Sequence, residues 1–285
     1  MSTNISKLSI LPVLISVKIK NKACLCATNE YLCTSTGTGF LYRKNDMIYL
    51  ITNRHVVTER SLENEILPHC SGGIPELLHF DIPVQRLNAE TKEIVLEVGP
   101  LTGDIRLYSS DGKALWLVHP EHKTDVVAIP MFNIADIEQH VLCLNDMPLE
   151  DKMVISVADD VFVIGYPYGK TSGLECPLAI WKRATIASEP NSSFYPDGRD
   201  TFLIDTTTRS DMSGSPVFAK VSNVCTFENG GIVLGSGQYY KFLGVYSSRI
   251  DGDRLDDSFL GIVWKAKLID EIIDGNVKEN NPPML

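Results

Sequence analysis

The sequence predicts an all-β protein with a single helix near its C-terminus. Short runs that are apolar, or that alternate between apolar and polar residues, recur along the whole chain, and such runs are typical of strands. They cover residues 8–20, 40–43, 47–52, 93–98, 114–118, 125–132, 161–166, 178–186, 202–205, 231–234 and 240–247. Only residues 265–274 place apolar side chains at helical spacing, and Gly275 ends that pattern.

The number of strand-like runs fits two six-stranded Greek-key β-barrels within one domain that spans residues 1–285. We expect the N-terminal barrel over about residues 1–145, the C-terminal barrel over about 158–265, and the helix with its tail over 266–285. A chain of this size can bury about three quarters of its unfolded surface, which allows a substantial core. The tail over residues 276–285 is polar, contains two prolines and is expected to fray.

The first run, residues 8–17, follows Lys7 and could be read as the apolar core of a signal peptide. However, Pro12 interrupts it, Lys18 and Lys20 follow it, and it lacks a small-residue cleavage site. We therefore expect it to form the first strand. Membrane-spanning segments are absent from the sequence, so no membrane partner is expected.

A serine turn lies in residues 210–216 (Ser-Asp-Met-Ser-Gly-Ser-Pro), between the apolar run 202–204 and the strand-like residues that begin at Val217. A serine between tight-turn residues and flanked by strands is one way of presenting a hydroxyl to an acyl carbon. By itself the composition is that of an ordinary loop. A catalytic role for Ser213 therefore requires a histidine and an acid elsewhere in the chain.

His55 and Asp125 are the candidates for these two roles. His55 is set apart from the other five histidines because it closely follows the strand-like run 47–52. Asp125 opens an otherwise apolar run and should be partly buried, so it needs a partner such as an imidazole N–H. Taken alone, Asp125 is more readily explained as the cap of a turn before the strand.

The order His55, Asp125, Ser213 excludes two other hydrolase architectures. An α/β-hydrolase needs a histidine after its serine, yet no histidine follows His140. The subtilisin order needs an acid well before the histidine, and Asp46 precedes His55 by only nine residues.

Six motifs in register support the same assignment. They occupy residues 37–41 (Gly-Thr-Gly-Phe-Leu), 52–57 (Thr-Asn-Arg-His-Val-Val), 125–128 (Asp-Val-Val-Ala), 164–167 (Ile-Gly-Tyr-Pro), 243–248 (Leu-Gly-Val-Tyr-Ser-Ser) and 260–264 (Leu-Gly-Ile-Val-Trp). Together they resemble the chymotrypsin-like (trypsin-like) serine peptidases, in particular the bacterial members that lack disulfides. The resemblance implies a serine endopeptidase that forms an acyl-enzyme, with His55 as general base, Asp125 holding the imidazole tautomer and Ser213 as nucleophile.

The resemblance also places an oxyanion hole at the backbone N–H groups of Asp211 and Ser213, each worth roughly 3 to 4 kcal/mol. The family has glycine where this chain has Asp211. Aspartate tolerates left-handed backbone angles, but its carboxylate puts negative charge near a developing oxyanion and should slow the reaction. The sequence therefore leaves open a weak enzyme, a peptidase activated by a partner protein, and a catalytically silent peptidase fold that acts as a binding module.

Specificity is expected to favour a small or medium uncharged side chain before the scissile bond. The family places the floor of the primary pocket six residues before the nucleophile, at Thr207, and puts Ser248 on its wall, and neither is charged. The backbone groups of Tyr246, Ser247 and Ser248 should bind an extended substrate by strand addition.

The charge and the cysteines restrict the partners and the compartment. A net charge of −10 without a basic stretch argues against nucleic acid. The expected partner is therefore a protein or peptide substrate in extended conformation, with a regulatory protein as a second candidate. Seven scattered cysteines favour free thiols in a reducing compartment, which indicates a cytoplasmic protein.

Four possible ligand sites are set aside, so no metal and no cofactor is expected. Cys24, Cys26 and Cys33 could be three metal ligands, but no fourth lies nearby. Residues 165–171 imitate a P-loop with one residue too few between the glycines, and residues 251–262 imitate a calcium loop without its glycine and glutamate. His119 and His122, on either side of Pro120, are better explained by a polar turn.

Overall fold

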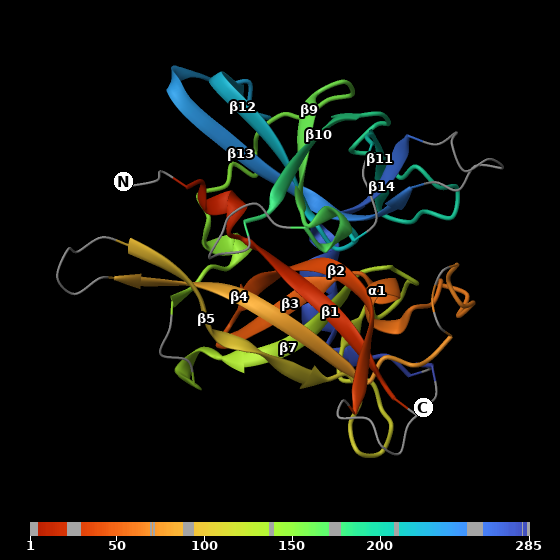
Figure 1. The fold of residues 1–285 in the computed structure, drawn as a ribbon. Coiled ribbons are helices and arrows are strands. Elements are labelled where there is room, and N and C mark those ends of the chain that lie inside the picture. The colour runs from red at the N-terminus through yellow and green to blue at the C-terminus, as the bar shows by residue number, and fades with distance from the viewer. Residues whose placement is uncertain are drawn as a thin grey trace.

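The computed structural model describes residues 5–21, 30–68, 70, 72–87, 94–136, 140–170, 178–207, 211–249, 259–280 and 282–283. Two β units lie one above the other, the first coloured red to yellow-green and the second green to blue (Figure 1). Strands dominate both units, and one longer helix, α2 (Lys267–Gly275), lies near the C-terminus. The all-β fold class with a C-terminal helix is confirmed.

The first unit is a curled antiparallel sheet in the order β15-β6-β7-β3-β2-β1-β4-β5, with β8 paired to β4. Its described part has nine strands rather than six, because the short strands β6, β8 and β15 join the longer ones. The strands are β1 (Pro12–Lys20), β2 (Tyr31–Lys44), β3 (Met47–Thr52), β4 (Leu77–Leu87), β5 (Ile94–Arg106), β6 (Leu117–Val118), β7 (Val127–Asn133), β8 (His140–Val141) and β15 (Val277–Lys278).

The second unit is a closed barrel with the expected six strands in its described part, in the order β10-β11-β14-β13-β12-β9. Because the sheet closes on itself, it has no open edge along these strands. The strands are β9 (Asp160–Gly165), β10 (Ile180–Ile186), β11 (Thr201–Asp205), β12 (Pro216–Thr226), β13 (Ile232–Arg249) and β14 (Leu260–Lys265).

Alternating burial explains why the predicted strands form. In β1 the side chains of Val13, Ile15 and Val17 are buried in the core of the first unit, while the residues between them are more exposed. A period of two places every second side chain on one face of a sheet. The run first considered as a signal-peptide core is therefore a strand with one buried face.

A shared apolar layer joins the two units. Phe40 of β2 packs edge-on against Phe242 of β13, with the ring centroids 5.6 Å apart. The Tyr166 hydroxyl, from the residue after β9, donates a buried hydrogen bond of 2.8 Å to the Pro12 carbonyl of β1. The strands that carry the motifs of both sequence halves thus meet across a packed interface, and this interface fixes the two units relative to each other.

The helix α2 follows the sequence pattern closely. Its buried side chains, Leu268, Ile269, Ile272 and Ile273, lie at helical spacing on one face. Gly275 is the last helical residue, and Asn276 forms the left-handed cap with φ 49°. A side chain at Gly275 would approach Pro120 to 2.8 Å, so close packing accounts for the glycine.

The expectation that the tail frays is wrong for its first residues. Val277 pairs with Val118 and Lys278 with Leu117, so β15 adds an edge strand to the first sheet. The side chain of Glu279, which follows, is only 11% exposed. The strand β15 could not be predicted from the polar composition of the tail, because it forms by pairing with β6, which is distant in sequence.

Strand β4 was also missed by the sequence pattern. Pro83 interrupts it, and proline within a run argues against a central strand. The register between β4 and β5 shifts between Asp81 and Pro83, so the proline sits at an irregularity of the ladder.

Within the described residues, no helix is long and apolar enough to cross a membrane.

Candidate functional site

His55 lies on α1 (Arg54–Thr58), a short helix directly after β3. The helix has no side-chain cap bond from Asn53, its N-cap residue. Instead, the buried Asn53 amide donates to the Asp125 carbonyl at 2.6 Å, and the Arg54 backbone N–H donates to the same carbonyl at 3.3 Å. The start of α1 is therefore attached to the segment that carries Asp125.

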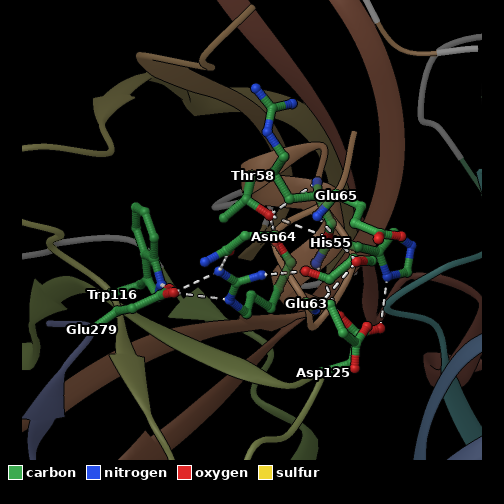
Figure 2. Close-up of polar contacts among 11 residues, drawn as sticks. His55, Thr58, Glu63, Asn64, Glu65, Trp116, Asp125 and Glu279 are labelled. Atoms are coloured by element: carbon green, nitrogen blue, oxygen red, sulfur yellow. Dashed lines mark hydrogen bonds and ion pairs between the residues drawn. The ribbon is translucent and has the colours of Figure 1, made fainter. Parts of the chain in front are cut away.

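His55 and Asp125 form a close pair (Figure 2). The Nδ1 atom of His55 lies 2.6 Å from Oδ2 of Asp125, and the His55 backbone N–H donates to Oδ1 at 2.9 Å. Asp125 is 7% exposed and lies two residues before β7, rather than within the strand. A carboxylate so placed fixes the ring orientation and favours a proton on Nδ1, which leaves Nε2 free to act as a base.

The Asp125 carboxylate is held in its ionised form. Burial alone would raise the pKa of Asp125, but the His55 ring and the hydrogen bonds from Ser247 and the His55 backbone outweigh it and lower that pKa below its usual value. A permanent negative charge beside His55 stabilises the imidazolium that forms when the ring accepts a proton.

Ser247 of β13 connects the acid to the serine turn. Its hydroxyl donates to Oδ2 of Asp125 at 2.5 Å, and its carbonyl accepts a hydrogen bond of 2.6 Å from the Ser213 hydroxyl. The structure thus brings the three predicted residues His55, Asp125 and Ser213 to one place, with Ser247 between them. The Ser213 proton points to Ser247 rather than to His55.

The turn that carries Ser213 is bound to β2. The Thr38 backbone N–H donates to the Ser213 carbonyl at 2.9 Å, and the Thr38 hydroxyl donates to the Asp211 carbonyl at 2.9 Å. Gly214 has φ 86°, and a side chain there would come within 1.9 Å of the Thr38 carbonyl oxygen. Only glycine fits this close approach of two backbones.

Asp211 adopts the left-handed conformation that the sequence allowed, with φ 72°. Its carboxyl is half-buried, and burial raises its pKa above the usual value, partly offset by a hydrogen bond from Thr36. In the described part of the chain, the backbone N–H groups of Asp211 and Ser213 donate to no other residue. Among the described residues, these two N–H groups of the serine turn therefore have no hydrogen-bond acceptor within the protein.

The remaining predicted site residues differ in what they offer. Thr207 is exposed, and its hydroxyl lies 3.4 Å from Nζ of Lys182, which places a cation beside it. Tyr246 is buried, its N–H donates to the Ser215 carbonyl at 2.9 Å, and its carbonyl accepts from the Gly214 N–H at 2.8 Å. Ser248 is exposed. Of the three β13 residues, Tyr246 and Ser247 thus bond to the serine turn, Ser247 through the Ser213 hydroxyl, whereas no bond joins the Ser248 backbone to the described part of that turn.

The structure describes only part of the possible ligand sites. His119 is buried and bonded to Glu271 at 3.1 Å, and its ring stacks on His122. Among the residues that the structure describes, no cluster of histidine, cysteine and acid side chains could hold a metal ion. Cys24, Cys26, Cys176 and the calcium-like loop at 251–258 lie outside the described residues.

Sequence reasoning missed three groups of this site: the Asn53 amide, the Thr38 hydroxyl and the Ser247 hydroxyl. Each lies inside a motif that had been noted, at 37–41, 52–57 and 243–248. The motifs indicate strands and the position of His55, whereas these polar side chains contact residues far away in sequence. Their presence among apolar strand residues was the available signal, because a buried polar group needs a partner.

Comparison with known proteins identifies the family of the chain. No curated protein matches the sequence. Among solved structures, the Rv3671c protease from M. tuberculosis in its active form has a TM-score of 0.43 at 17% identity, covering 96% of this chain and 84% of that one. The Rv3671c protease in its inactive form has a TM-score of 0.41 at 17% identity, covering 94% and 89% respectively. Residues 37–225 match the family described as the trypsin-like peptidase domain. The chain belongs to the family of trypsin-like peptidase domains.

Proposed function

We propose that this protein is a serine endopeptidase that uses His55, Asp125 and Ser213. The observation that carries the proposal is the contact of partly buried His55 with buried Asp125 at 2.6 Å, joined through Ser247 to the Ser213 hydroxyl at 2.6 Å. An imidazole oriented by a carboxylate next to a serine in a strand-flanked turn is the arrangement that acyl transfer requires.

In the proposed reaction, the Ser213 oxygen attacks the peptide carbonyl carbon while Nε2 of His55 accepts the hydroxyl proton. The backbone N–H groups of Asp211 and Ser213 bind the oxyanion of the tetrahedral intermediate. The C–N bond then breaks, and His55 returns the proton to the leaving amine. Water adds to the acyl-enzyme by the same route and restores Ser213, so the cycle needs no metal or cofactor.

Substrate binding would also prepare the nucleophile. In the structure, the Ser213 hydroxyl donates to the Ser247 carbonyl. An extended peptide that adds to β13 presents its own N–H groups to free strand carbonyls. If a substrate N–H takes the Ser247 carbonyl, the Ser213 hydroxyl loses its acceptor and can turn to His55.

The proposed substrate is an extended protein segment with an uncharged side chain before the scissile bond. Lys182 beside Thr207 adds a reason against a basic side chain, because two cations at this distance repel. A cytoplasmic location is part of the proposal, since the four cysteines that the structure describes, Cys33, Cys70, Cys143 and Cys225, are free thiols.

Labelling with a fluorophosphonate probe tests the proposal. This probe phosphonylates a serine that an oriented histidine activates, and peptide mapping identifies the modified residue. We expect modification of Ser213 in the native protein and none after denaturation in urea, because activation requires the folded pair of His55 and Asp125. Modification at another serine, or none at all in the presence of extended peptides, would contradict an active enzyme.

Variants at Asp211 are expected to separate charge from backbone conformation. Asparagine tolerates the left-handed φ of 72° at position 211 as aspartate does, but Asp211→Asn removes the negative charge. We expect the loss of repulsion between this charge and the oxyanion to lower the activation free energy by about 1.4 kcal/mol, which makes labelling roughly tenfold faster. Asp211→Ala also removes the charge but disfavours left-handed angles by about 1 to 2 kcal/mol, and should gain less. Labelling rates of the three proteins are compared at pH 7.

The alternative function is a catalytically silent binding module. The Ser213 hydroxyl bound to Ser247, together with the charge of Asp211 beside the turn, is the observation that favours it. If neither the wild type nor Asp211→Asn reacts, while isothermal calorimetry still detects an extended peptide, the binding module replaces the endopeptidase.

A further inference from the structure

A buried ion pair links the residue before His55 to the C-terminal segment. Nε and one terminal nitrogen of Arg54 donate to Oε1 of Glu279 at 2.9 and 2.6 Å. The two side chains are only 7% and 11% exposed. A charge that has left water must be paired, so each of the two side chains depends on the other.

Each partner of the pair is held by further hydrogen bonds, drawn in Figure 2. The Arg54 guanidinium also donates to the Ser61 carbonyl at 2.8 Å and to the Asn64 side chain at 2.5 Å. The second carboxylate oxygen of Glu279 accepts from the Trp116 indole N–H at 2.7 Å. The network therefore reaches from the loop after α1 to Trp116, the residue before β6.

The register of β15 explains how Glu279 reaches this position. Val277 pairs with Val118 and Lys278 with Leu117, so the next antiparallel pair would place Glu279 opposite Trp116. The helix α2 packs its apolar face into the molecule just before this strand. Glu279 thus follows two packed elements, the helix α2 and the strand β15, which fix its position in the first unit.

On the other side of the pair, α1 has little stability of its own. It has five residues and no side-chain cap, and isolated helices of this length do not form in water. Its N-terminal turn is held by bonds to Asp125, and its first side chain is held by Glu279. His55 lies between these two attachments, since it directly follows Arg54.

We propose that Glu279 is a positioning residue of the active site, which acts through Arg54 to hold α1 and so keeps His55 in register with Asp125 and Ser213. This role rests on the proposed endopeptidase function. Glu279 touches neither substrate nor reacting atoms. Its effect is on the orientation of the imidazole, and a small misplacement of a catalytic base lowers turnover strongly.

The test compares Glu279→Gln with Asp274→Asn, a matched loss of a carboxylate near the end of α2. Asp274 pairs with Lys44 at 2.7 Å and is 66% exposed, so its loss should change little. For Glu279→Gln we expect kcat to fall about tenfold or more while KM changes less than about twofold, because orientation and not substrate binding is lost.

A second readout does not depend on catalysis. The Nδ1 proton of His55, in its short bond to Asp125, should give a low-field proton NMR signal. We expect Glu279→Gln to shift or broaden this signal and Asp274→Asn to leave it unchanged. If Glu279→Gln does not fold, as judged by circular dichroism, Glu279→Asp replaces it with the same expected direction.

A double-mutant cycle shows whether Glu279 acts through Arg54. If it does, Arg54→Gln combined with Glu279→Gln lowers kcat no further than the more damaging single variant. Unchanged kcat and an unchanged His55 signal in a folded Glu279→Gln protein overturn the positioning role. If instead the wild type itself fails to cleave peptides, the endopeptidase proposal fails, and the NMR comparison still decides the role of Glu279.

Discussion

Replacing Ser213 with alanine is expected to lower kcat for an extended peptide by roughly 10⁶-fold, with KM nearly unchanged. The substitution removes the only atom that can form the acyl-enzyme in the proposed reaction. The turn itself should persist, because the Ser213 carbonyl bond to Thr38 and the φ 86° of Gly214 involve backbone alone. Single-turnover hydrolysis of a fluorogenic peptide, with circular dichroism as a check on folding, measures the loss.

The matched control for this prediction is Ser215→Ala. Ser215 lies two residues away in the same turn, is fully buried, and its hydroxyl has no hydrogen-bond partner among the described residues. Its loss should therefore change kcat by less than about threefold, since no charge or hydrogen bond is removed. If Ser213→Ala retains a substantial part of the wild-type rate while Ser215→Ala abolishes it, Ser213 is not the nucleophile.

The candidate site could be assigned from the sequence because its main residues carry local signals. His55 follows a strand, Asp125 precedes an apolar strand, and Ser213 sits next to the one glycine that the turn requires. None of these local signals is specific alone, and it is the order of the three residues, together with the six motifs in register, that assigns the positions and excludes other hydrolase folds. In the structure, His55 contacts Asp125, and Ser247 bonds to both Asp125 and Ser213, while the catalytic roles of the three residues stay a prediction.

The groups that orient the site could not be assigned in this way. The Ser247 hydroxyl acts on Asp125, which is 122 residues away, and Glu279 acts on Arg54 at a separation of 225 residues. No periodicity or turn composition links residues that meet only across a folded interface. One signal existed, because a fully buried tryptophan such as Trp116 needs a partner for its N–H.

The predicted number of strands in the first unit, six instead of the nine in its described part, was wrong for a related reason. The strands of the second barrel have five or more residues and include apolar runs such as 161–166 and 202–205, so their pattern is visible in the sequence. The first sheet includes two-residue strands such as β8 and β15, which have no pattern of their own. Such pairings form because the longer elements bring the two segments into contact, and they can be recognised only once those elements are placed.

Replacing Asp125 with asparagine is expected to lower kcat by about 10⁴-fold while the protein stays folded. The Asp125 carboxylate accepts three hydrogen bonds: Oδ2 from the His55 ring and the Ser247 hydroxyl, and Oδ1 from the His55 backbone. An amide has only one oxygen. If its NH₂ faces the ring, His55 must place its proton on Nε2 and can no longer accept one from Ser213.

The opposite amide orientation is unfavourable as well, because the NH₂ group would then face the His55 backbone N–H. Ser247→Ala is the matched control, since it removes one donor to Asp125 but leaves the carboxylate and the imidazole tautomer intact. We expect it to lower kcat only about tenfold, as the loss of one hydrogen bond to a charged group implies. In Asp125→Asn, ¹⁵N NMR of His55 should report the proton on Nε2 at neutral pH. A wild-type tautomer together with near wild-type kcat would show that Asp125 is only a structural cap of α1, the role that a turn-capping aspartate would have.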